Sequence, residues 1–411
     1  MFDQQVATRS VGEYRPEEKE VSMPSPSTDR TVADGTIPKS QTLIATSPNK
    51  LKLGIFGINL AGGAGGISTM PGPMKVNNWE EQKHIAIMAD RAGFEVLVPV
   101  SRWKGLGGSS GHWDRSYETW AWGAALAEAT ERIQIFTTCA IPLFHPVMAA
   151  KLGATLDHIS GGRWGLNIVP GWFASEFKMF GMDLGDRESR YKYAQEWVDI
   201  LDRLWSEKGE FDFEGEFFKL EGAESAPKPM QTRPTIMNAG QSPEGQKFAV
   251  ENADMIYIKL RHNDECRKTI EAIRAQAAAA GREVAIWGNL DVICKPTEQE
   301  ARDFADAWTK ASDDEALGRF VEGITGSDSA SMDFLRENPE TANILRLSGG
   351  GESVIGSPEQ IAAALQGYSD MGMDGLALTF HEYPEAVEYF ISDVHPLLVK
   401  AGLRTEHSLD S

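Results

Sequence analysis

From Leu53 onward, short apolar runs alternate with longer segments whose apolar residues recur at helical spacing. A short apolar run bounded by turn residues is typical of a buried strand, and the longer segments are typical of amphipathic helices. Eight runs are predicted as strands: residues 53–59, 94–100, 132–141, 163–170, 233–240, 253–260, 284–294 and 374–380. Eight strands, each followed by a helix over about 350 residues, match a (β/α)8 TIM barrel better than an open doubly wound sheet.

The stretch ISGGRWGLNIVPGW, residues 159–172, is the most informative part of this pattern. Gly161 and Gly162 stand where a helix must end in a left-handed cap, and a nearly continuous apolar strand follows them. Asn167 interrupts that strand. Because a buried amide needs hydrogen-bond partners, Asn167 either points at a cofactor or another polar ligand, or bonds to neighbouring backbone.

The barrel is expected to span residues 51–402, between two tails. Residues 1–50 are rich in Pro, Ser, Thr and charge without sustained apolar periodicity, so a flexible tail is predicted, and residues 403–411 form a short C-terminal tail. In a TIM barrel the carboxyl ends of the strands form the active-site mouth. Extra material is expected in three places: a glycine-rich loop at 62–66, a hairpin within 211–220 and an excursion over 313–350 that could lie over the mouth as a lid.

Composition narrows the class of protein. Sixty acidic and forty basic residues give a net charge of -20, which argues against a nucleic acid partner. The three cysteines lack CxxC spacing and the eight histidines lack metal-ligand spacing, so we expect no disulfide framework and no metal site. The chain shows no membrane span and no signal-peptide pattern, and a cytoplasmic protein is expected. A GxSxG elbow for triad hydrolysis is also missing.

An anion site is suggested after the fifth predicted strand. Ser242 stands as the N-cap and Pro243 as the first residue of a helix, which leaves free backbone N–H groups at the helix N-terminus. Arg190 and Tyr191 open an earlier helix and would supply a cation and a phenol to a phosphate there. The alternatives are plain helix capping by Ser242 and a solvated ion pair of Arg190.

Several other polar or aromatic residues follow predicted strands. Trp103, in the loop SRWKGLGG, either stacks on a flat ligand or packs against a neighbouring loop. Thr138 ends the third strand at the mouth. Glu176 is either a ligand-binding carboxylate or an N-terminal helix charge. His381 follows the eighth strand, where a functional role and a plain loop role are both open.

Five blocks in this order carry a resemblance to a known family: GLGG at 105–108 with WD at 113–114, RIQIFTT at 132–138, DHISGGRWGLNIVPGW at 157–172, RY at 190–191 and AGQS at 239–242. Over about residues 51–400 the chain resembles the bacterial luciferase-like flavin-dependent monooxygenases, and within them the pyrimidine monooxygenase branch that opens the uracil ring. The resemblance implies a TIM barrel that binds FMN at its mouth, receives reduced flavin from a separate reductase and consumes dioxygen.

The resemblance also implies roles for particular residues. Those expected to bind the cofactor are Ser101, Arg102, Asn167, Glu176, Arg190, Tyr191, Gln241 and Ser242. Those expected around the flavin N5 edge, where dioxygen is held, are Val98, Thr138, Asn167 and Trp172. Val98 and Trp172 would exclude water, while Thr138 and Asn167 would donate hydrogen bonds to oxygen as negative charge develops. In this branch the reduced flavin is thought to form a peroxide at N5, a nucleophile for an electron-poor carbon.

The substrate is expected to contact Arg102, Trp103, Glu176 and His381. Two departures from the branch lie nearby, because Ser101-Arg102 replaces Ile-Lys and Pro170 replaces Thr. An Arg fork in place of a Lys point charge suggests a ligand with a bidentate acceptor or a ring broader than uracil. The candidates are a pyrimidine or related nitrogen heterocycle, and also riboflavin, a sulfone or a chlorinated aromatic, on which related enzymes act.

Two other functions remain open at this point. One is a luciferase-like reductase or dehydrogenase that uses a deazaflavin and transfers hydride without oxygen. The other is a catalytically silent flavin-binding barrel, against which the polar strand ends Thr138 and Asn167 argue. Barrels of this family commonly associate through their helices, so the resemblance also implies a homo-oligomer.

Overall fold

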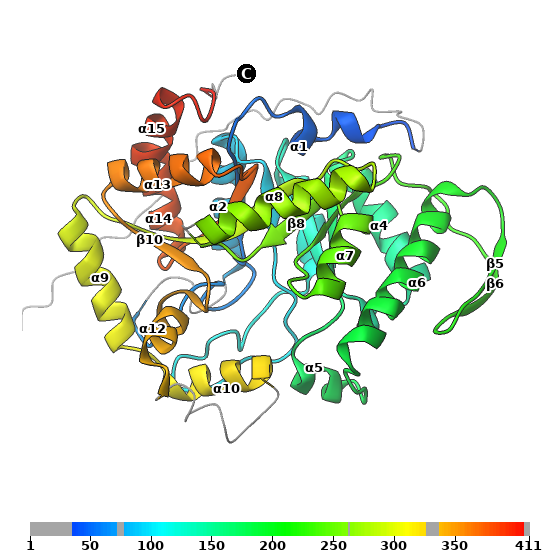
Figure 1. The fold of residues 1–411 in the computed structure, drawn as a ribbon, viewed down its shortest axis with the longest axis horizontal. Helices are drawn as coiled ribbons and strands as arrows, with labels where there is room; N and C mark the ends of the chain where they lie inside the picture. Colours follow the sequence, from blue (N-terminus) through cyan, green and yellow to red (C-terminus); the bar gives the residue numbers. More distant parts are fainter. Residues whose placement is uncertain (1–34, 72–77, 262–263, 326–336, 407–411) are drawn as a thin grey trace, which may run out of the picture. The chain divides into compact units, whose positions relative to one another are not determined.

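Eight parallel strands close into a barrel in the computed structural model, which describes residues 35–71, 78–261, 264–325 and 337–406 (Figure 1). The barrel strands are β1 (Lys52–Phe56), β2 (Val96–Val98), β3 (Gln134–Ala140), β4 (Trp164–Val169), β7 (Thr235–Asn238), β8 (Met255–Ile258), β9 (Ala285–Cys294) and β11 (Gly375–Thr379). Pairing of β9 with both β8 and β11 closes the sheet. The TIM barrel and all eight predicted strands are thereby confirmed.

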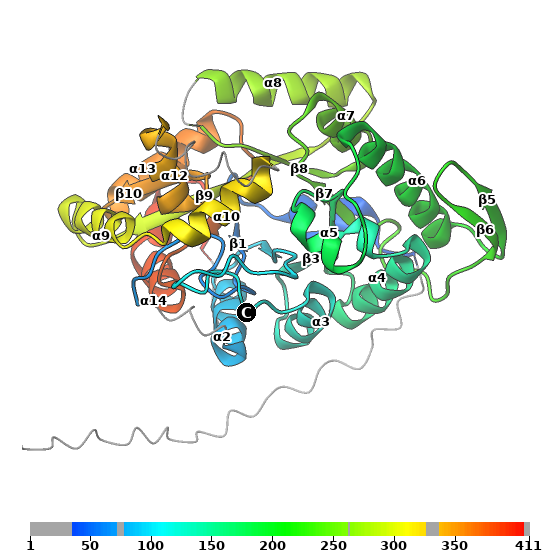
Figure 2. The same ribbon diagram turned by 90° about the horizontal axis from the view of Figure 1, so that it is seen from below.

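Helices surround the barrel and bury its outer apolar face (Figure 2). They are α2 (Trp79–Arg91), α3 (Thr119–Ala129), α4 (Pro146–Ser160), α6 (Arg187–Ser206), α7 (Pro243–Asn252), α8 (Asp264–Ala279), α9 (Glu298–Lys310), α13 (Pro358–Asp370), α14 (Tyr383–Tyr389), η4 (Phe390–Val394) and α15 (His395–Lys400). Their ends follow the sequence. Asn78 caps α2, and α4 ends at Gly161, whose φ of 66° is the predicted left-handed cap.

Insertions gather at one end of the barrel. Figure 1 shows α5 (Ala174–Met179), α10 (Asp314–Thr325) and α12 (Pro339–Ser348) on the same side of the molecule. Helix α10 shares a second apolar cluster with the loops that follow β1, β2 and β4, so it covers the mouth as expected of a lid. The expected hairpin is formed by β5 (Phe211–Glu214) and β6 (Lys219–Ala223).

One strand was not predicted. Strand β10 (Glu352–Gly356) pairs with the last five residues of β9, outside the barrel. It escapes a search for apolar runs because four of its five residues are only half-buried. The long β9 therefore serves two neighbours, with its first part inside the barrel wall and its last part beside β10.

The described part of the N-terminal segment differs from a flexible tail. Residues 35–50 carry η1 (Lys39–Gln41) and α1 (Leu43–Thr46), while residues 1–34 lie outside the described part of the chain. The backbone of Ile37 exchanges hydrogen bonds with Met230 and Thr232, and the Lys39 ammonium lies 2.6 Å from Asp254. Composition alone does not reveal these partners.

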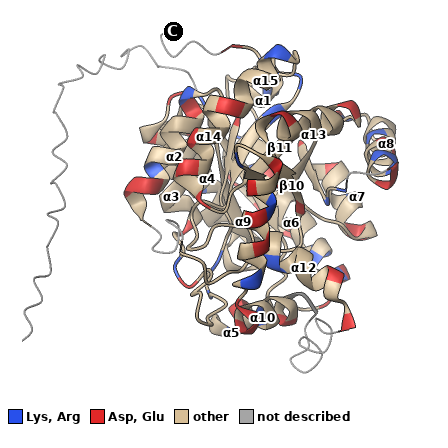
Figure 3. Cartoon of the chain, turned by 90° about the vertical axis from the view of Figure 1, so that its left-hand side faces the viewer, with Lys and Arg blue, Asp and Glu red and all other residues tan. Residues whose placement is uncertain are grey.

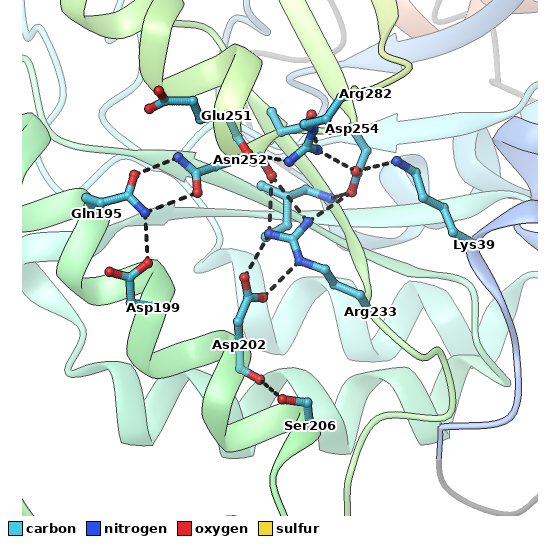
Figure 4. A network of polar contacts seen from close by, with 12 residues as sticks. Lys39, Gln195, Asp199, Asp202, Ser206, Arg233, Glu251, Asn252, Asp254 and Arg282 are labelled. Atoms are coloured by element: carbon cyan, nitrogen blue, oxygen red, sulfur yellow. Dashed lines mark hydrogen bonds and ion pairs between the residues drawn. The ribbon is translucent and has the colours of Figure 1, made fainter. Parts of the chain in front are cut away.

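Asp254 forms ion pairs with several cationic side chains near the amino ends of the strands. Its carboxylate accepts from Lys39, from Arg233 and from Arg282, as Figure 4 shows, and also from the backbone N–H of Ile236. The Asp254 side chain is 6% exposed. This network ties the N-terminal segment to β7 and β8 at the end of the barrel opposite the insertions.

The other end of the chain is tied down by a buried ion pair. Arg404 donates to Glu95 at 3.0 Å, and the two side chains are 1% and 2% exposed. Glu95 also accepts from Asn49 and from the backbone of Leu53. Within the segment predicted as a C-terminal tail, Arg404 and Thr405 still contact the rest of the protein, since the backbone of Thr405 donates to Asn49 Oδ1 at 2.8 Å; residues 407–411 lie outside the described part.

Replacing Arg404 with Met should lower the free energy of unfolding by about 3 kcal/mol, because Glu95 would remain buried without its cation. Urea unfolding measures the change. The matched control is Arg302→Met, which breaks an exposed pair with Glu298 and should cost less than about 1 kcal/mol. Equal losses for the two variants would show that the buried pair has no special role.

Charges lie on the surrounding helices, where both signs are interspersed, as on α8 and α9 (Figure 3). Acidic residues outnumber basic ones in the whole sequence, 60 to 40. No helix in the described ranges combines the length and the apolar character that crossing a bilayer requires.

Candidate active site

An apolar cluster of side chains, called the plug below, fills the part of the barrel interior on the amino-terminal side of the mouth. Its side chains come from alternate, inward-facing strand positions. They are Val96, Val98, Phe136, Met237, Met255, Tyr257, Trp287 and Ala377. Two residues beyond the plug residues of β3 and β9, the inward positions carry Thr138 and Asn289, and Asn167 of β4 is paired with Thr138. Polar side chains therefore form the floor of the space above the plug.

That space is a cavity of about 820 Å³ beneath α10. Strand ends from β1, β3, β4, β7 and β9 and the segment after α12 contribute to its wall. Among the expected site residues, those lining it are Ser101, Arg102, Thr138, Asn167, Trp172, Glu176, Arg190, Tyr191, Gln241 and Ser242. Residues up to 141 positions apart in the sequence thus meet in one cavity of ligand size.

Thr138 and Asn167 lie in contact on the floor. The Asn167 Nδ2 donates to Thr138 Oγ1 at 3.0 Å, and the Thr138 hydroxyl donates to the carbonyl oxygen of Pro99 at 2.5 Å. In this arrangement the only hydroxyl proton of Thr138 is used in the bond to Pro99, so donation by Thr138 to oxygen stays a prediction that requires this bond to break. The same chain of bonds orients the amide, and Asn167 Oδ1 is buried without a partner among the described residues.

Arg102 is held in the wall by a carboxylate and three rings. Its Nη1 lies 2.9 Å from Glu176 Oε1, and both side chains are almost fully buried. The guanidinium carbon lies 4.4 Å from the Trp172 ring centre, 5.0 Å from that of Phe173 and 5.1 Å from that of Trp113. Burial lowers the pKa of Arg102 to about 10, so the side chain stays charged at neutral pH.

Glu176 also organises the loop after β2. Its Oε1 accepts from the backbone N–H groups of Trp103 at 2.8 Å and Lys104 at 3.2 Å, in addition to Arg102. One nitrogen of the Arg102 fork is therefore occupied by the protein itself. The Nε of Arg102 is buried and has no partner in the described ranges.

Another part of the cavity wall offers groups suited to an anion. Ser242 caps α7 and accepts from the backbone N–H of Gly245 at 3.1 Å, as predicted for an N-cap. Arg187 and Arg190, from the first turn of α6, line the cavity with it. Arg190 donates to the carbonyl oxygen of Gly171, and its Nε is buried without a partner in the described part of the chain. Two cations and a helix N-terminus thus face one region.

Tyr191 and Gln241 complete this wall. Burial raises the pKa of the Tyr191 phenol, which lies beside Gly245 and keeps its proton. The Gln241 amide donates to the carbonyl oxygens of Tyr257 at 2.8 Å and Ala239 at 3.0 Å. Gln241 therefore shapes the turn before α7 through backbone bonds.

Three expected site residues lie elsewhere. Val98 belongs to the apolar plug below the cavity. Trp103 is 37% exposed, and its ring packs edge-on at 5.3 Å against Phe180. His381 is buried, with Nε2 2.8 Å from the carbonyl oxygen of Leu347 and its ring 4.4 Å from that of Trp308. A position directly after a strand is thus not sufficient to bring a side chain into the cavity, since the loop backbone decides where each side chain points.

Other cavity residues escaped the sequence analysis. Phe320 comes from the lid helix α10, Ser348 is the last residue of α12, and Gly349 and Gly351 follow it. Nothing local in the sequence marks these positions. Asn289 could have been recognised from the sequence, because it interrupts the apolar strand β9 as Asn167 interrupts β4. Within the described ranges, no three His, Cys, Asp or Glu side chains form a metal site.

Comparison with known proteins decides the family, because residues 55–375 match the model of the luciferase-like monooxygenases. The chain belongs to this family. It is 29% identical over 373 residues to the pyrimidine monooxygenase RutA of Allorhizobium ampelinum, covering 88% of this chain and 99% of the relative. It is 30% identical over 355 residues to RutA of Acinetobacter baylyi, covering 85% of this chain and 95% of the relative.

The fold is similar to that of a crystal structure of the riboflavin lyase RcaE, described with modified FMN and riboflavin. The TM-score is 0.77 at 21% identity, covering 88% of this chain and 94% of that one. Membership of the family makes the chain an enzyme of the flavin-dependent monooxygenase class. The resemblance drawn from the five sequence blocks is confirmed.

Proposed function

We propose that the protein is an FMN-dependent monooxygenase that takes reduced flavin from a separate reductase and uses dioxygen to oxidise a small, electron-poor molecule. A pyrimidine or related nitrogen heterocycle is the proposed substrate class, since the relatives named above are pyrimidine monooxygenases. The supporting observation is one cavity that combines an anion-binding wall with a buried amide on its floor.

The cavity suits FMN on three counts. Arg187, Arg190 and the N-terminus of α7 can hold a phosphate. Trp172 offers an aromatic wall for a flat ring. The unpartnered Oδ1 of Asn167 requires a donor, which a flavin ring nitrogen can provide.

Reduced FMN, when bound, would supply the electrons that activate dioxygen, at its N5 edge in our proposal. Asn167 would place its amide beside that edge, and Thr138 would fix the amide by accepting from Nδ2. Trp172 and Phe320, whose rings are 6.1 Å apart, would exclude bulk water from the same space. Val98 would contribute only indirectly, as support for the floor.

An oxygen-uptake assay tests the proposal. The protein, FMN, NADH and an added flavin reductase are mixed under air with uracil, thymine, riboflavin or dimethyl sulfone in separate reactions, and products are identified by mass. Substrate-dependent incorporation of oxygen from ¹⁸O₂ is the expected result. Conversion of a substrate without oxygen incorporation would contradict the proposal.

The phosphate end has a test of its own. The double variant Arg187→Ala/Arg190→Ala should bind FMN at least about tenfold more weakly while binding riboflavin as the wild type does, because only FMN carries the phosphate. Quenching of flavin fluorescence measures both affinities. Arg302→Ala, on the exposed face of α9, is the control. An equal loss for FMN and riboflavin would place the phosphate elsewhere.

A further inference from the structure

The side chain of Asn289 has no assigned task, although it stands on the cavity floor. On β9, Ile286 and Leu290 belong to the core outside the barrel, and Trp287 belongs to the plug inside it. Asn289 lies two residues beyond Trp287 and therefore points to the barrel interior, where it lines the cavity. A polar residue there is costly unless something bonds to it.

The amide of Asn289 has no bonding partner in the described part of the chain. Its Oδ1 is buried and has no hydrogen-bond partner there. Asn238, another amide that lines the cavity, is different, because it donates to the carbonyl oxygen of Ile168 and accepts from Gly240. Asn238 therefore serves the backbone, whereas the described residues leave the amide of Asn289, which also lines the cavity, without a partner.

Small neighbours keep the space beside Asn289 open. On β11 the residue paired with it is Ala377. Gly351 also lines the cavity, and a Cβ atom there would lie 3.7 Å from Asn289 Nδ2. A methyl group at position 351 would lie in van der Waals contact with that nitrogen, so the glycine leaves the nitrogen uncovered on this side.

Resting on the proposed function, we propose that Asn289 is a binding residue that recognises the amide edge of a ring, where an N–H stands next to a C=O. A carboxamide presents a donor and an acceptor side by side, and such an edge is its complement. Asn289 Nδ2 donates to the ring carbonyl and Oδ1 accepts from the ring N–H. Both the flavin pyrimidine ring and a pyrimidine substrate carry this edge, so either can be the source.

Two variants test the inference in different ways. Asn289→Leu removes both hydrogen-bonding groups at similar volume, and Gly351→Ala leaves the amide in place but covers its nitrogen. Asn343→Leu, an exposed position on α12, is the matched control. Circular dichroism verifies that each variant is folded.

Two binding measurements distinguish the sources. In the flavin arm, fluorescence gives the affinity for oxidised FMN and for 3-methyl-FMN, which lacks the ring N–H. In the substrate arm, calorimetry on the FMN-loaded protein gives the affinity for uracil and for 1,3-dimethyluracil. In one of the two arms, Asn289→Leu should weaken binding of the ligand that carries the ring N–H about tenfold, and binding of its methylated analogue less than twofold. Gly351→Ala should act in the same arm and direction.

Some results would overturn the inference. One is that Asn289→Leu leaves the affinities for FMN and for uracil unchanged. The same holds if the wild type binds no uracil and Asn289→Leu leaves the affinity for FMN unchanged. Another is equal weakening of the N–H ligands and the methylated ones, which indicates lost packing. In each case the proposed function still holds if the wild type binds FMN and incorporates oxygen. If the wild type fails to bind FMN, both the proposed function and the role of Asn289 are contradicted.

Discussion

Replacing Asn167 with Ala should lower the rate of substrate oxygenation about a hundredfold, the loss usual for one polar group aimed at developing charge. The variant removes the amide that Thr138 orients and leaves the Thr138 hydroxyl bonded to Pro99. Because the fold around the floor rests on the apolar plug, stability should change little. The rate is measured as product formed per reduced flavin consumed.

The control for this variant is Asn343→Ala, which removes an exposed amide from α12. FMN affinity is measured in parallel, and we expect a loss smaller than tenfold for Asn167→Ala. If the variant bound FMN normally and formed product at the wild-type rate, Asn167 would have no part in the reaction.

Replacing Glu176 with Leu should lower the free energy of unfolding by about 3–5 kcal/mol. Arg102 would then stay buried as a charge with no carboxylate at hand, and the backbone N–H groups of Trp103 and Lys104 would lose their acceptor. Urea unfolding measures the loss. Flavin binding should weaken too, because the loop after β2 forms part of the cavity wall.

Further variants decide whether the buried charge is the cause. Arg102→Met/Glu176→Leu should recover part of the stability, since neither charge remains buried. Glu315→Leu, which breaks an exposed pair with Arg319, should cost less than about 1 kcal/mol. If the Leu variant of Glu176 proves insoluble, Glu176→Gln keeps an acceptor for the backbone and should show a smaller loss. A double variant less stable than the single one would contradict the explanation.

The barrel itself was predictable because its strands are buried on both faces and therefore read as apolar runs. The caps at Gly161 and Ser242 were equally predictable, since each rests on local backbone chemistry. Strand β10 was missed because it lies half-buried at an edge. The contacts of residues 35–50 could not be predicted, because their partners, such as Asp254, are distant in the sequence.

The site was predictable where residues stand at strand ends and less so in loops. Thr138 and Asn167 meet as the register of β3 and β4 requires, since these two residues are paired across the strands. The order of hydrogen bonds between them depends on Pro99, which no strand pattern identifies. Trp103 and His381 follow strands as well, but contacts with Phe180 and Leu347 turn them away from the cavity.

The lid helix α10 has a consequence for how such enzymes can diversify. Phe320 reaches the cavity from an insertion between β9 and β11, whereas Arg190 and Ser242 come from elements between β4 and β8. Substitutions in α10 can therefore reshape the roof without disturbing the residues proposed to hold the phosphate. An exchange of this one helix between related enzymes would be an economical route to new substrates on an unchanged flavin platform.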